Sequence, residues 1–216
     1  MMCALGVVYA LFMCLYRAKS AHLSVLRMLI LFTFSISVGF SGAIFTHFVV
    51  TLFTAGLSGY TPGFVFYGGL IFGFLGAFAA GKLFAFSLSD YAPAAVPSLP
   101  AAHALGRIGC FLAGCCYGCE WEKGVLHPDG VFRFPVQLLE SACLIVISAF
   151  LVFAVKRGEK RPLRLYVLLY APVRFLLEFL RADAVRGSFL FLSTSQWISL
   201  LLLILALIPV KKTAKG

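Results

Sequence analysis

Charged residues are scarce in this chain, and acidic ones are the scarcest. Asp, Glu, Lys and Arg make up 12% of its 216 residues, Asp and Glu number 8, and 62% of the residues are apolar. Mean hydropathy is +1.00. A soluble domain carries about 25% charged and about 45–50% apolar residues. The chain therefore lacks the polar side chains to cover itself in water, and it is predicted to be an integral membrane protein.

The apolar runs also lack the alternation of polar and apolar residues that is typical of membrane β-barrels. Because lipid admits only helices or closed barrels, we expect an all-α bundle. About 20 apolar residues cross the hydrocarbon layer, which gives seven expected spans. Pro97 and Pro100 interrupt the fourth, and the first is short. The expected spans are residues 2–16, 27–53, 64–86, 93–114, 135–155, 164–181 and 193–210.

Several other signals are missing. No linker, low-complexity tract or soluble appendage interrupts residues 1–216, so we expect a single transmembrane domain. The first apolar run has no basic n-region and no clear cleavage site, so it is predicted to be a retained span rather than a signal peptide. No internal repeat is visible, which argues against a transporter.

The net charge of +10 is arranged by position rather than spread evenly. Twelve of the 18 Lys and Arg residues follow alternate expected spans on one side. The positive-inside rule makes that side cytoplasmic, with the N-terminus outside and the C-terminus inside, and nucleic acid is not expected as a partner. The twelve are Arg17, Lys19, Arg27, Lys82, Lys156, Arg157, Lys160, Arg161, Arg164, Lys211, Lys212 and Lys215.

Ionisable residues inside the expected spans are the strongest indication of a functional site. A guanidinium at bilayer depth costs roughly 2.5–3.5 kcal/mol, so each of these needs a partner or a polar cavity. One hypothesis is that Arg107 and Arg174, from different spans, form a clamp for a phospholipid phosphate, whose oxygens match the arginine fork. The alternative is structural: Arg107 pairs with Glu140, Arg174 pairs with Glu178, and the ion pairs hold helices together.

Spacing groups these residues further. Tyr170 lies four residues before Arg174, which lies four before Glu178, so all three share one helical face. Pro172 loosens this helix and frees a carbonyl. Gln137 lies three residues before Glu140 and shares its face.

Small residues recur every four positions at Gly106, Cys110, Gly114 and Gly118. If helical, they form a smooth face on which another backbone approaches closely, and plain helix packing explains that equally well.

Gly68 and Gly69 come early in the third expected span, after Tyr67. Adjacent glycines weaken a helix, so they indicate either close backbone approach or N–H groups exposed to a ligand. Tyr67 is either an acid/base or hydrogen-bonding group or an interfacial anchor.

Four of the seven cysteines cluster at the outer end of the fourth expected span: Cys110, Cys115, Cys116 and Cys119. The C-x-x-C pair Cys116 and Cys119 favours a disulfide outside the cytoplasm. Small packing residues, a redox thiol and a metal site are the alternatives, but no second pair completes four metal ligands. The other three cysteines are isolated in apolar spans and are expected to be small core residues: Cys3, Cys14 and Cys143.

The segment Gly106-Arg107-Ile108-Gly109-x-Phe111, with Gly118, resembles the signature of the bacterial prolipoprotein diacylglyceryl transferases. The similarity extends over residues from about 60 to 205. Further segments agree with the family in order: Phe66-Tyr67-Gly68-Gly69-Leu70, Asp90-Tyr91-Ala92-Pro93, Pro135-x-Gln137-Leu138-x-Glu140, Tyr170-x-x-x-Arg174-Phe175 and Ser193-x-Ser195-Gln196.

The resemblance implies an enzyme at the outer face of the bacterial cytoplasmic membrane. It moves diacylglyceryl from phosphatidylglycerol to the cysteine thiol of a prolipoprotein signal peptide, or to a related nucleophile, and glycerol phosphate leaves. No metal or diffusible cofactor is implied, and membrane lipids surround the site. The implied catalytic residues are Arg107, Arg174, Tyr67 and Tyr170. The implied substrate-binding residues are Gly68, Gly69, Gly109, Cys110, Cys115, Gly118, Gln137, Glu140 and Glu178.

The chain departs from the family pattern at polar positions near the reacting centre. Tyr67 replaces the family histidine, and Cys110 replaces the asparagine of the signature. A phenol with a pKa near 10 is a poorer base at neutral pH than an imidazole near 6.5. A second hypothesis is therefore a non-catalytic or thiol-redox membrane protein derived from the family. The remaining departures are Ala113, Cys115 and Phe134.

Overall fold

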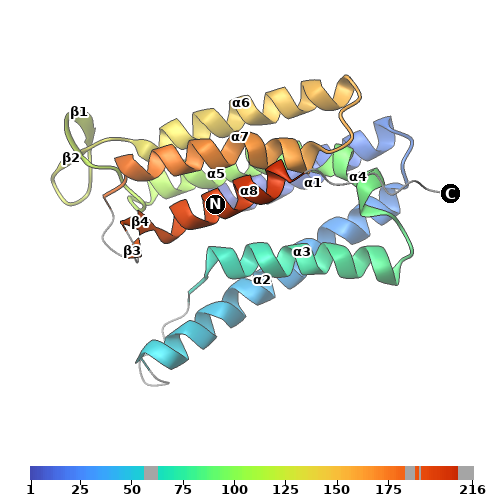
Figure 1. The fold of residues 1–216 in the computed structure, drawn as a ribbon, viewed down its shortest axis with the longest axis horizontal. Coiled ribbons are helices and arrows are strands. Elements are labelled where there is room, and N and C mark those ends of the chain that lie inside the picture. Colours follow the sequence, from blue (N-terminus) through green and yellow to red (C-terminus); the bar gives the residue numbers. More distant parts are fainter. Residues whose placement is uncertain (56–62, 183–187, 190, 209–216) are drawn as a thin grey trace. The chain divides into compact units, whose positions relative to one another are not determined.

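The computed structural model describes residues 1–55, 63–182, 188–189 and 191–208. Over these residues the chain is mostly helical, and three helices, α1, α2 and α6, are long and apolar enough to cross a membrane (Figure 1). The helices are α1 (Met2–Ser20), α2 (Val25–Ala55), α3 (Phe66–Leu83), α4 (Leu88–Ala95), α5 (Ser98–Leu112), α6 (Val136–Lys156), α7 (Pro162–Leu177), the 3₁₀ turn η2 (Glu178–Leu180) and α8 (Thr194–Leu207).

Each expected span overlaps a helix, and the helical character predicted from the sequence is confirmed. The fourth expected span is divided, because α4 ends at Ala95 and Pro97 caps the start of α5. Proline fixes φ and supplies no N–H, so it favours the beginning of a helix over its interior. The apolar helices α3 and α8 are shorter than a full span. The count of seven spans and the direction of the termini stay predictions.

The all-α expectation overlooked two short antiparallel hairpins. Strand β1 (Glu120–Leu126) pairs with β2 (Phe132–Arg133), and β3 (Ser188–Phe189) pairs with β4 (Leu192–Ser193). The first is closed by the turn Pro128-Asp129-Gly130, where Gly130 has a φ of 83° and donates its N–H to the carbonyl of His127 at 2.9 Å. A Pro-Asp-Gly sequence is a strong turn signal, so this hairpin was readable from the sequence.

The described chain divides into two compact units. The first unit contains Met1–Ala10 and everything from Ala95 onward, and the second contains Leu11–Ala94. Helix α1 contributes to both. The single domain expected over residues 1–216 stays a prediction, and each unit is considered by itself below.

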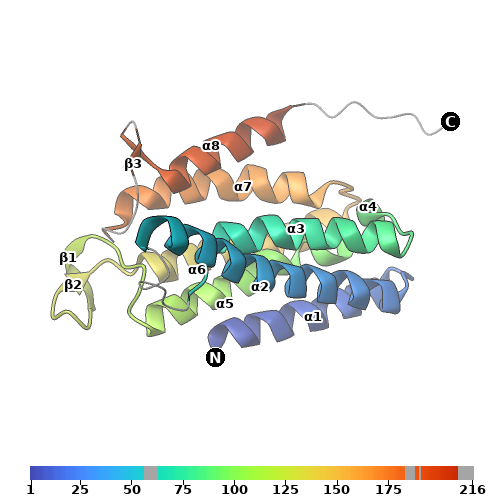
Figure 2. The same ribbon diagram turned by 90° about the horizontal axis from the view of Figure 1, so that it is seen from below.

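In the second unit, α2 and α3 lie side by side and meet through glycines (Figures 1 and 2). A Cβ added to Gly39 would lie 3.0 Å from the carbonyl oxygen of Gly69 and 3.1 Å from Cα of Gly73. A Cβ on Gly76 would lie 2.7 Å from the carbonyl oxygen of Phe34. The two backbones therefore approach more closely than any larger residue allows, as small-residue helix pairs do in membranes.

In the first unit, α5 packs on α6, α6 on α7, and α7 on α8. Leu144 of α6 is fully buried in this core. Two serines of α6 bind carbonyl groups of the preceding segment: Ser141 Oγ donates to Ala104 O at 3.1 Å, and Ser148 Oγ donates to Pro97 O at 2.7 Å. These bonds leave α5 and α6 in fixed register, which positions the charged residues described next.

Candidate functional site

The interior of the first unit holds an ion pair between two helices. Arg107 of α5 is 8% exposed and Glu140 of α6 is 1% exposed. The guanidinium Nη2 of Arg107 lies 2.6 Å from Oε2 of Glu140. Burial of either charge alone would be costly, and a close partner offsets much of that cost.

Glu140 also binds α7. The hydroxyl of Tyr170 donates to Oε1 of Glu140 at 2.7 Å. The ring of Tyr170 is stacked on Tyr166 at 5.6 Å between centroids, and the ring of His103 meets it edge-on at 5.5 Å. One carboxylate thus connects side chains from α5, α6 and α7.

A second ion pair lies at the far end of α7. Nη2 of Arg174 is 2.8 Å from Oε2 of Glu178 and donates to Oγ of Ser195 in α8 at 3.1 Å. Glu178 is 8% exposed and begins the turn η2, so the four-residue spacing predicted from the sequence survives the end of the helix. The arginine therefore joins α7 to α8.

We call these residues the arginine–carboxylate cluster: Arg107, Glu140, Tyr170, Arg174, Glu178 and Ser195. Both pairings anticipated by the structural alternative are present. The arginines are nevertheless only partly satisfied, because Nε of Arg107 and Nη1 of Arg174 are buried without a hydrogen-bond partner among the described residues. Both guanidinium groups also lie within electrostatic range of Glu140. Buried donors without acceptors are rare in native proteins and call for a ligand or water.

His103 is a residue that the sequence analysis overlooked. It lies in α5 four residues before Arg107, and it is within electrostatic range of Arg107, Glu140 and Arg174. The signal was available, since residues four apart share one helical face. This chain therefore has an imidazole at its charged cluster.

The smooth face expected at four-residue spacing is only half formed. Helix α5 ends at Leu112, and Gly114 has a φ of 64°, so Gly114 and Gly118 lie beyond the helix. A Cβ on Gly106 would meet nothing within 4 Å. A Cβ on Gly118 would instead clash with the carbonyl oxygens of Phe134 and Leu180. The interpretation as one continuous packing face is therefore wrong, because the left-handed backbone at Gly114 turns the chain away.

That turn is a Schellman motif, the usual helix ending at a left-handed glycine. The N–H of Cys115 donates to Cys110 O at 3.1 Å, and the N–H of Gly114 donates to Phe111 O at 3.1 Å. The fold-back brings the sulfurs of Cys110, Cys115 and Cys116 within 4.8 Å of one another. All seven cysteines are free thiols in the described chain, and Cys119 is not part of this group. The sequence pairing of Cys116 with Cys119 is thus not the arrangement that the structure shows.

Charge and hydrogen bonding distinguish the thiols outside the helix. A hydrogen bond from the Cys110 thiol, with a smaller contribution from Arg181, lowers the pKa of Cys116 to about 4. Partial desolvation and the neighbouring Cys116 raise the pKa of Cys115, although its side chain is exposed. The hydrogen bond and the nearby guanidinium both favour the thiolate form of Cys116.

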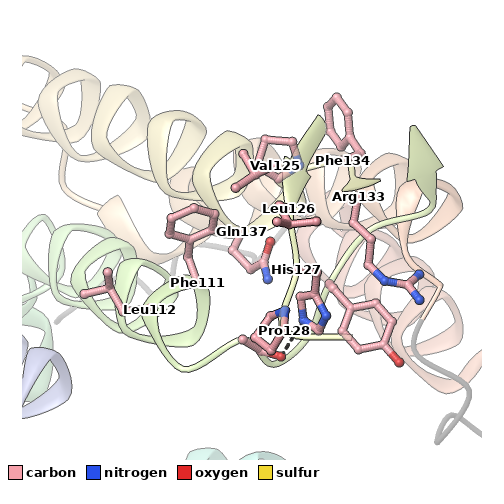
Figure 3. A pocket seen from close by; sticks show the side chains of 12 residues that line it. Phe111, Leu112, Val125, Leu126, His127, Pro128, Arg133, Phe134 and Gln137 are labelled. Carbon is pink, nitrogen blue, oxygen red and sulfur yellow. Dashed lines mark hydrogen bonds between the residues drawn. The ribbon is translucent and has the colours of Figure 1, made fainter. Parts of the chain in front are cut away.

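A hollow of about 270 Å³ opens between the end of α5 and the β1–β2 hairpin (Figure 3). Its walls are mostly apolar and include Phe111 and Leu112 from the end of α5 and Leu126 from the hairpin. Its polar side chains are few. Gln137 is 2% exposed and its Nε2 donates to Cys115 O at 2.8 Å, and Nε2 of His127 lies 2.7 Å from Gly114 O. Arg107 and Arg174 do not line this hollow.

The remaining predicted site residues are placed as follows. Gly109 lies in α5 against Met2, 3.0 Å from an added Cβ. Gly68 and Gly69 belong to the second unit, where they pack on α2, and the N–H of Gly69 is bonded to Val65 O. Tyr67 lies in α3, and its side chain is outside the described part of the chain. Whether these three meet the arginines stays a prediction.

A mostly helical, apolar chain with charged residues buried between its helices is a membrane protein with a polar interior site. This chain belongs to the prolipoprotein diacylglyceryl transferase family, whose model matches residues 1–210. The resemblance noted in the motifs is thereby confirmed.

Individual relatives agree with the family match. The chain is 40% identical over 152 residues, 66% of its length, to phosphatidylglycerol–prolipoprotein diacylglyceryl transferase 2 of Clostridium perfringens. It is 37% identical over 155 residues, 67% of its length, to the transferase of Clostridium tetani. The matched regions span 59% and 62% of those two relatives.

Proposed function

We propose that this protein is a phosphatidylglycerol-dependent diacylglyceryl transferase of the bacterial cytoplasmic membrane. The observation that supports it best is the pair of arginines from α5 and α7, each with a buried nitrogen that lacks an acceptor among the described residues. A lipid phosphate is an anion with oxygens that match guanidinium donors. The relatives named above carry this activity in their names.

The ion pairs refine how the arginines act in this proposal. Glu140 and Glu178 already hold one edge of each guanidinium, so they orient the arginines rather than touch the lipid. Nε of Arg107 and Nη1 of Arg174 then remain for the phosphate. Such preorganised donors stabilise the charge that develops on a leaving phosphate. Removal of one donor typically raises the activation free energy by about 3–4 kcal/mol.

The proposed reaction is a substitution at the glycerol carbon next to the phosphate. The acceptor thiolate sulfur forms the new S–C bond, the C–O bond breaks, and glycerol phosphate leaves with the electron pair. The thiol proton passes to water before the sulfur attacks. Tyr170 is engaged as a donor to Glu140, so it serves as a positioning residue here.

The proposal also includes the membrane arrangement. Seven spans, an outer N-terminus and a cytoplasmic C-terminus would put the hollow beside the β1–β2 hairpin at the outer face. Its apolar walls suit the aliphatic residues around a lipobox cysteine or part of an acyl chain.

The direct test uses purified protein in mixed micelles of detergent and phosphatidylglycerol with a lipobox peptide. We expect glycerol phosphate release and a peptide mass increase of one diacylglyceryl group. Arg107→Ala is expected to abolish both. Arg157→Ala is the matched control, because Arg157 is an exposed cap of α6, 4.1 Å from the ring of Phe153. An active Arg107→Ala protein, or no release from the parent protein with any thiol acceptor, would overturn the proposal.

A further inference from the structure

The cluster of Cys110, Cys115 and Cys116 has the geometry of a metal site. Its three sulfurs lie within 4.8 Å of one another, at the end of α5. Three thiolates around Zn²⁺ at 2.3 Å stand about 3.8 Å apart, so closure requires only a movement of about 1 Å or less. The Schellman hydrogen bonds hold Cys115 against Cys110, so most of the arrangement exists before any ion arrives.

The accessibility of the cluster fits a site with an open position. Cys115 is exposed, while Cys110 and Cys116 are half-buried. An ion entering from the exposed side would have three protein ligands and one free coordination position. Catalytic zinc sites have this composition, whereas structural sites are closed by four protein ligands.

The surrounding charges also suit a complex of a divalent ion with three thiolates. Such a complex has a net charge of −1, and the guanidinium groups of Arg107 and Arg181 lie within electrostatic range of Cys116. The sequence left a metal site as a weaker alternative, because the C-x-x-C spacing does not reveal that the loop after Gly114 folds back onto Cys110.

We propose that Cys110, Cys115 and Cys116 bind a thiophilic divalent ion of the Zn²⁺ type, whose open position takes the acceptor thiol. The second half rests on the proposed function. Coordination deprotonates the acceptor thiol and holds it as a thiolate, and the proton passes to solvent. The sulfur then forms the S–C bond while the C–O bond to the phosphate breaks. A bound ion would thus supply what the missing family histidine does not.

The first experiment measures binding without lipid or turnover. Reduced protein in detergent is dialysed against Zn²⁺ and assayed for metal per chain, then loaded with Co²⁺ to record thiolate charge-transfer absorption. We expect one ion per chain. Cys115→Ser and Cys116→Ser are each expected to weaken binding by about 100-fold or more. Mutation of a residue that only hydrogen-bonds to a metal ligand already lowers metal affinity by up to about 100-fold, and loss of a ligand itself should cost at least as much. Cys119→Ser and Cys143→Ser are the matched controls and are expected to bind normally.

Several outcomes overturn the metal site. They are no bound ion with the thiols reduced, unchanged affinity in Cys115→Ser and Cys116→Ser, or loss of binding in Cys119→Ser. Size-exclusion elution and melting temperature identify a variant that fails to fold. If Cys116→Ser fails to fold, the result for Cys115→Ser is used to judge the metal site, because the exposed Cys115 side chain contributes little to packing.

The second experiment tests the acceptor role on the Co²⁺ form. A lipobox peptide with its cysteine is expected to shift the absorption spectrum, and the same peptide with serine is expected to leave it unchanged. Identical spectra with both peptides would overturn the acceptor role. Failure of lipid transfer with intact metal binding and a cysteine-dependent shift would instead count against the proposed function, so the two failures are distinguishable.

Discussion

The helix pairs α2–α3 and α5–α6 bring helices together by opposite means. Between α2 and α3 the contacts are glycines, such as Gly39 against Gly69, which let backbones touch. Between α5 and α6 they are polar, with Arg107 against Glu140 and Ser141 against the carbonyl of Ala104. The first pair needs small volume and the second needs matched charge. Packing alone explains the glycine pair. In the charged pair, Nε of Arg107 has no acceptor among the described residues, so it is available to bind a ligand.

The largest expected effect breaks the charged pair. Arg107→Ala leaves Glu140 buried without its cation, which costs about 3–5 kcal/mol of stability. Transfer activity is expected to fall at least about 100-fold, as when a donor to a developing anion is removed. Thermal unfolding in detergent and glycerol phosphate release measure the two. Arg107→Lys keeps the charge but loses the fork, so recovered stability with low activity would assign the fork to the lipid phosphate.

A smaller effect is expected from Tyr170→Phe, which removes the hydrogen bond to Glu140 and keeps the ring stack. Hydrogen bonds to charged groups contribute about 1.5–3 kcal/mol, so unfolding is expected at a lower temperature. Full stability in this variant would show that water replaces the hydroxyl at Glu140. Activity is expected to fall mainly through kcat, because the substitution disturbs an arginine partner rather than the lipid.

The glycine pair is tested by Gly76→Ala against Gly106→Ala. A methyl on Gly76 would press on the carbonyl of Phe34 and on Val38, and such overpacking costs about 1–3 kcal/mol. Gly106 has open space and lies inside α5, so alanine there is expected to stabilise by about 0.5–1 kcal/mol. Melting temperatures of the two variants should therefore move in opposite directions. A Gly76→Ala variant that is as stable as the parent would remove close approach as the reason for glycine at this position of α3.

The smallest expected effect concerns an exposed ion pair on the hairpin. Hydrogen bonds from Arg133 lower the pKa of Asp129 to about 2. Because the folded pKa lies below the ordinary value of 3.8, the ionised pair stabilises the hairpin above about pH 4 and loses this contribution as pH falls towards 2. A carboxyl carbon titration by NMR is expected to show the low midpoint. Arg133→Gln is expected to return the midpoint to near 4.

Apolar run length was enough to locate the helices, because lipid leaves few alternatives to a helix. Helical spacing was also enough to propose both ion pairs, since Arg174 and Glu178 are four residues apart and Glu140 is a rare buried acid. Sequence spacing does not determine whether the arginines are paired with carboxylates or left to bind a phosphate, because that depends on the distances between side chains. His103 was overlooked for a different reason, since a lone histidine in the middle of an expected span has many ordinary roles.

The cysteine arrangement shows where local sequence is insufficient. C-x-x-C directs attention to Cys116 and Cys119, yet the sulfur group includes Cys110 from the preceding helix. That outcome depends on Gly114 ending α5 with a left-handed residue, and the spacing alone is equally compatible with a helix continuing through it. The hairpin after it was readable from Pro128-Asp129-Gly130, which shows that turn chemistry carries more information than charge in this loop.

Helices α7 and α8 are joined near both ends. Arg174 donates to Ser195 at one end, and Nε of Arg164 donates to the carbonyl of Ala206 at 2.7 Å at the other. Two such fastenings about three helical turns apart resist both sliding and splaying. We therefore expect α7 and α8 to move together as one rigid body. If the protein acts on a phospholipid as proposed, an opening that admits the lipid sideways would form between other helices.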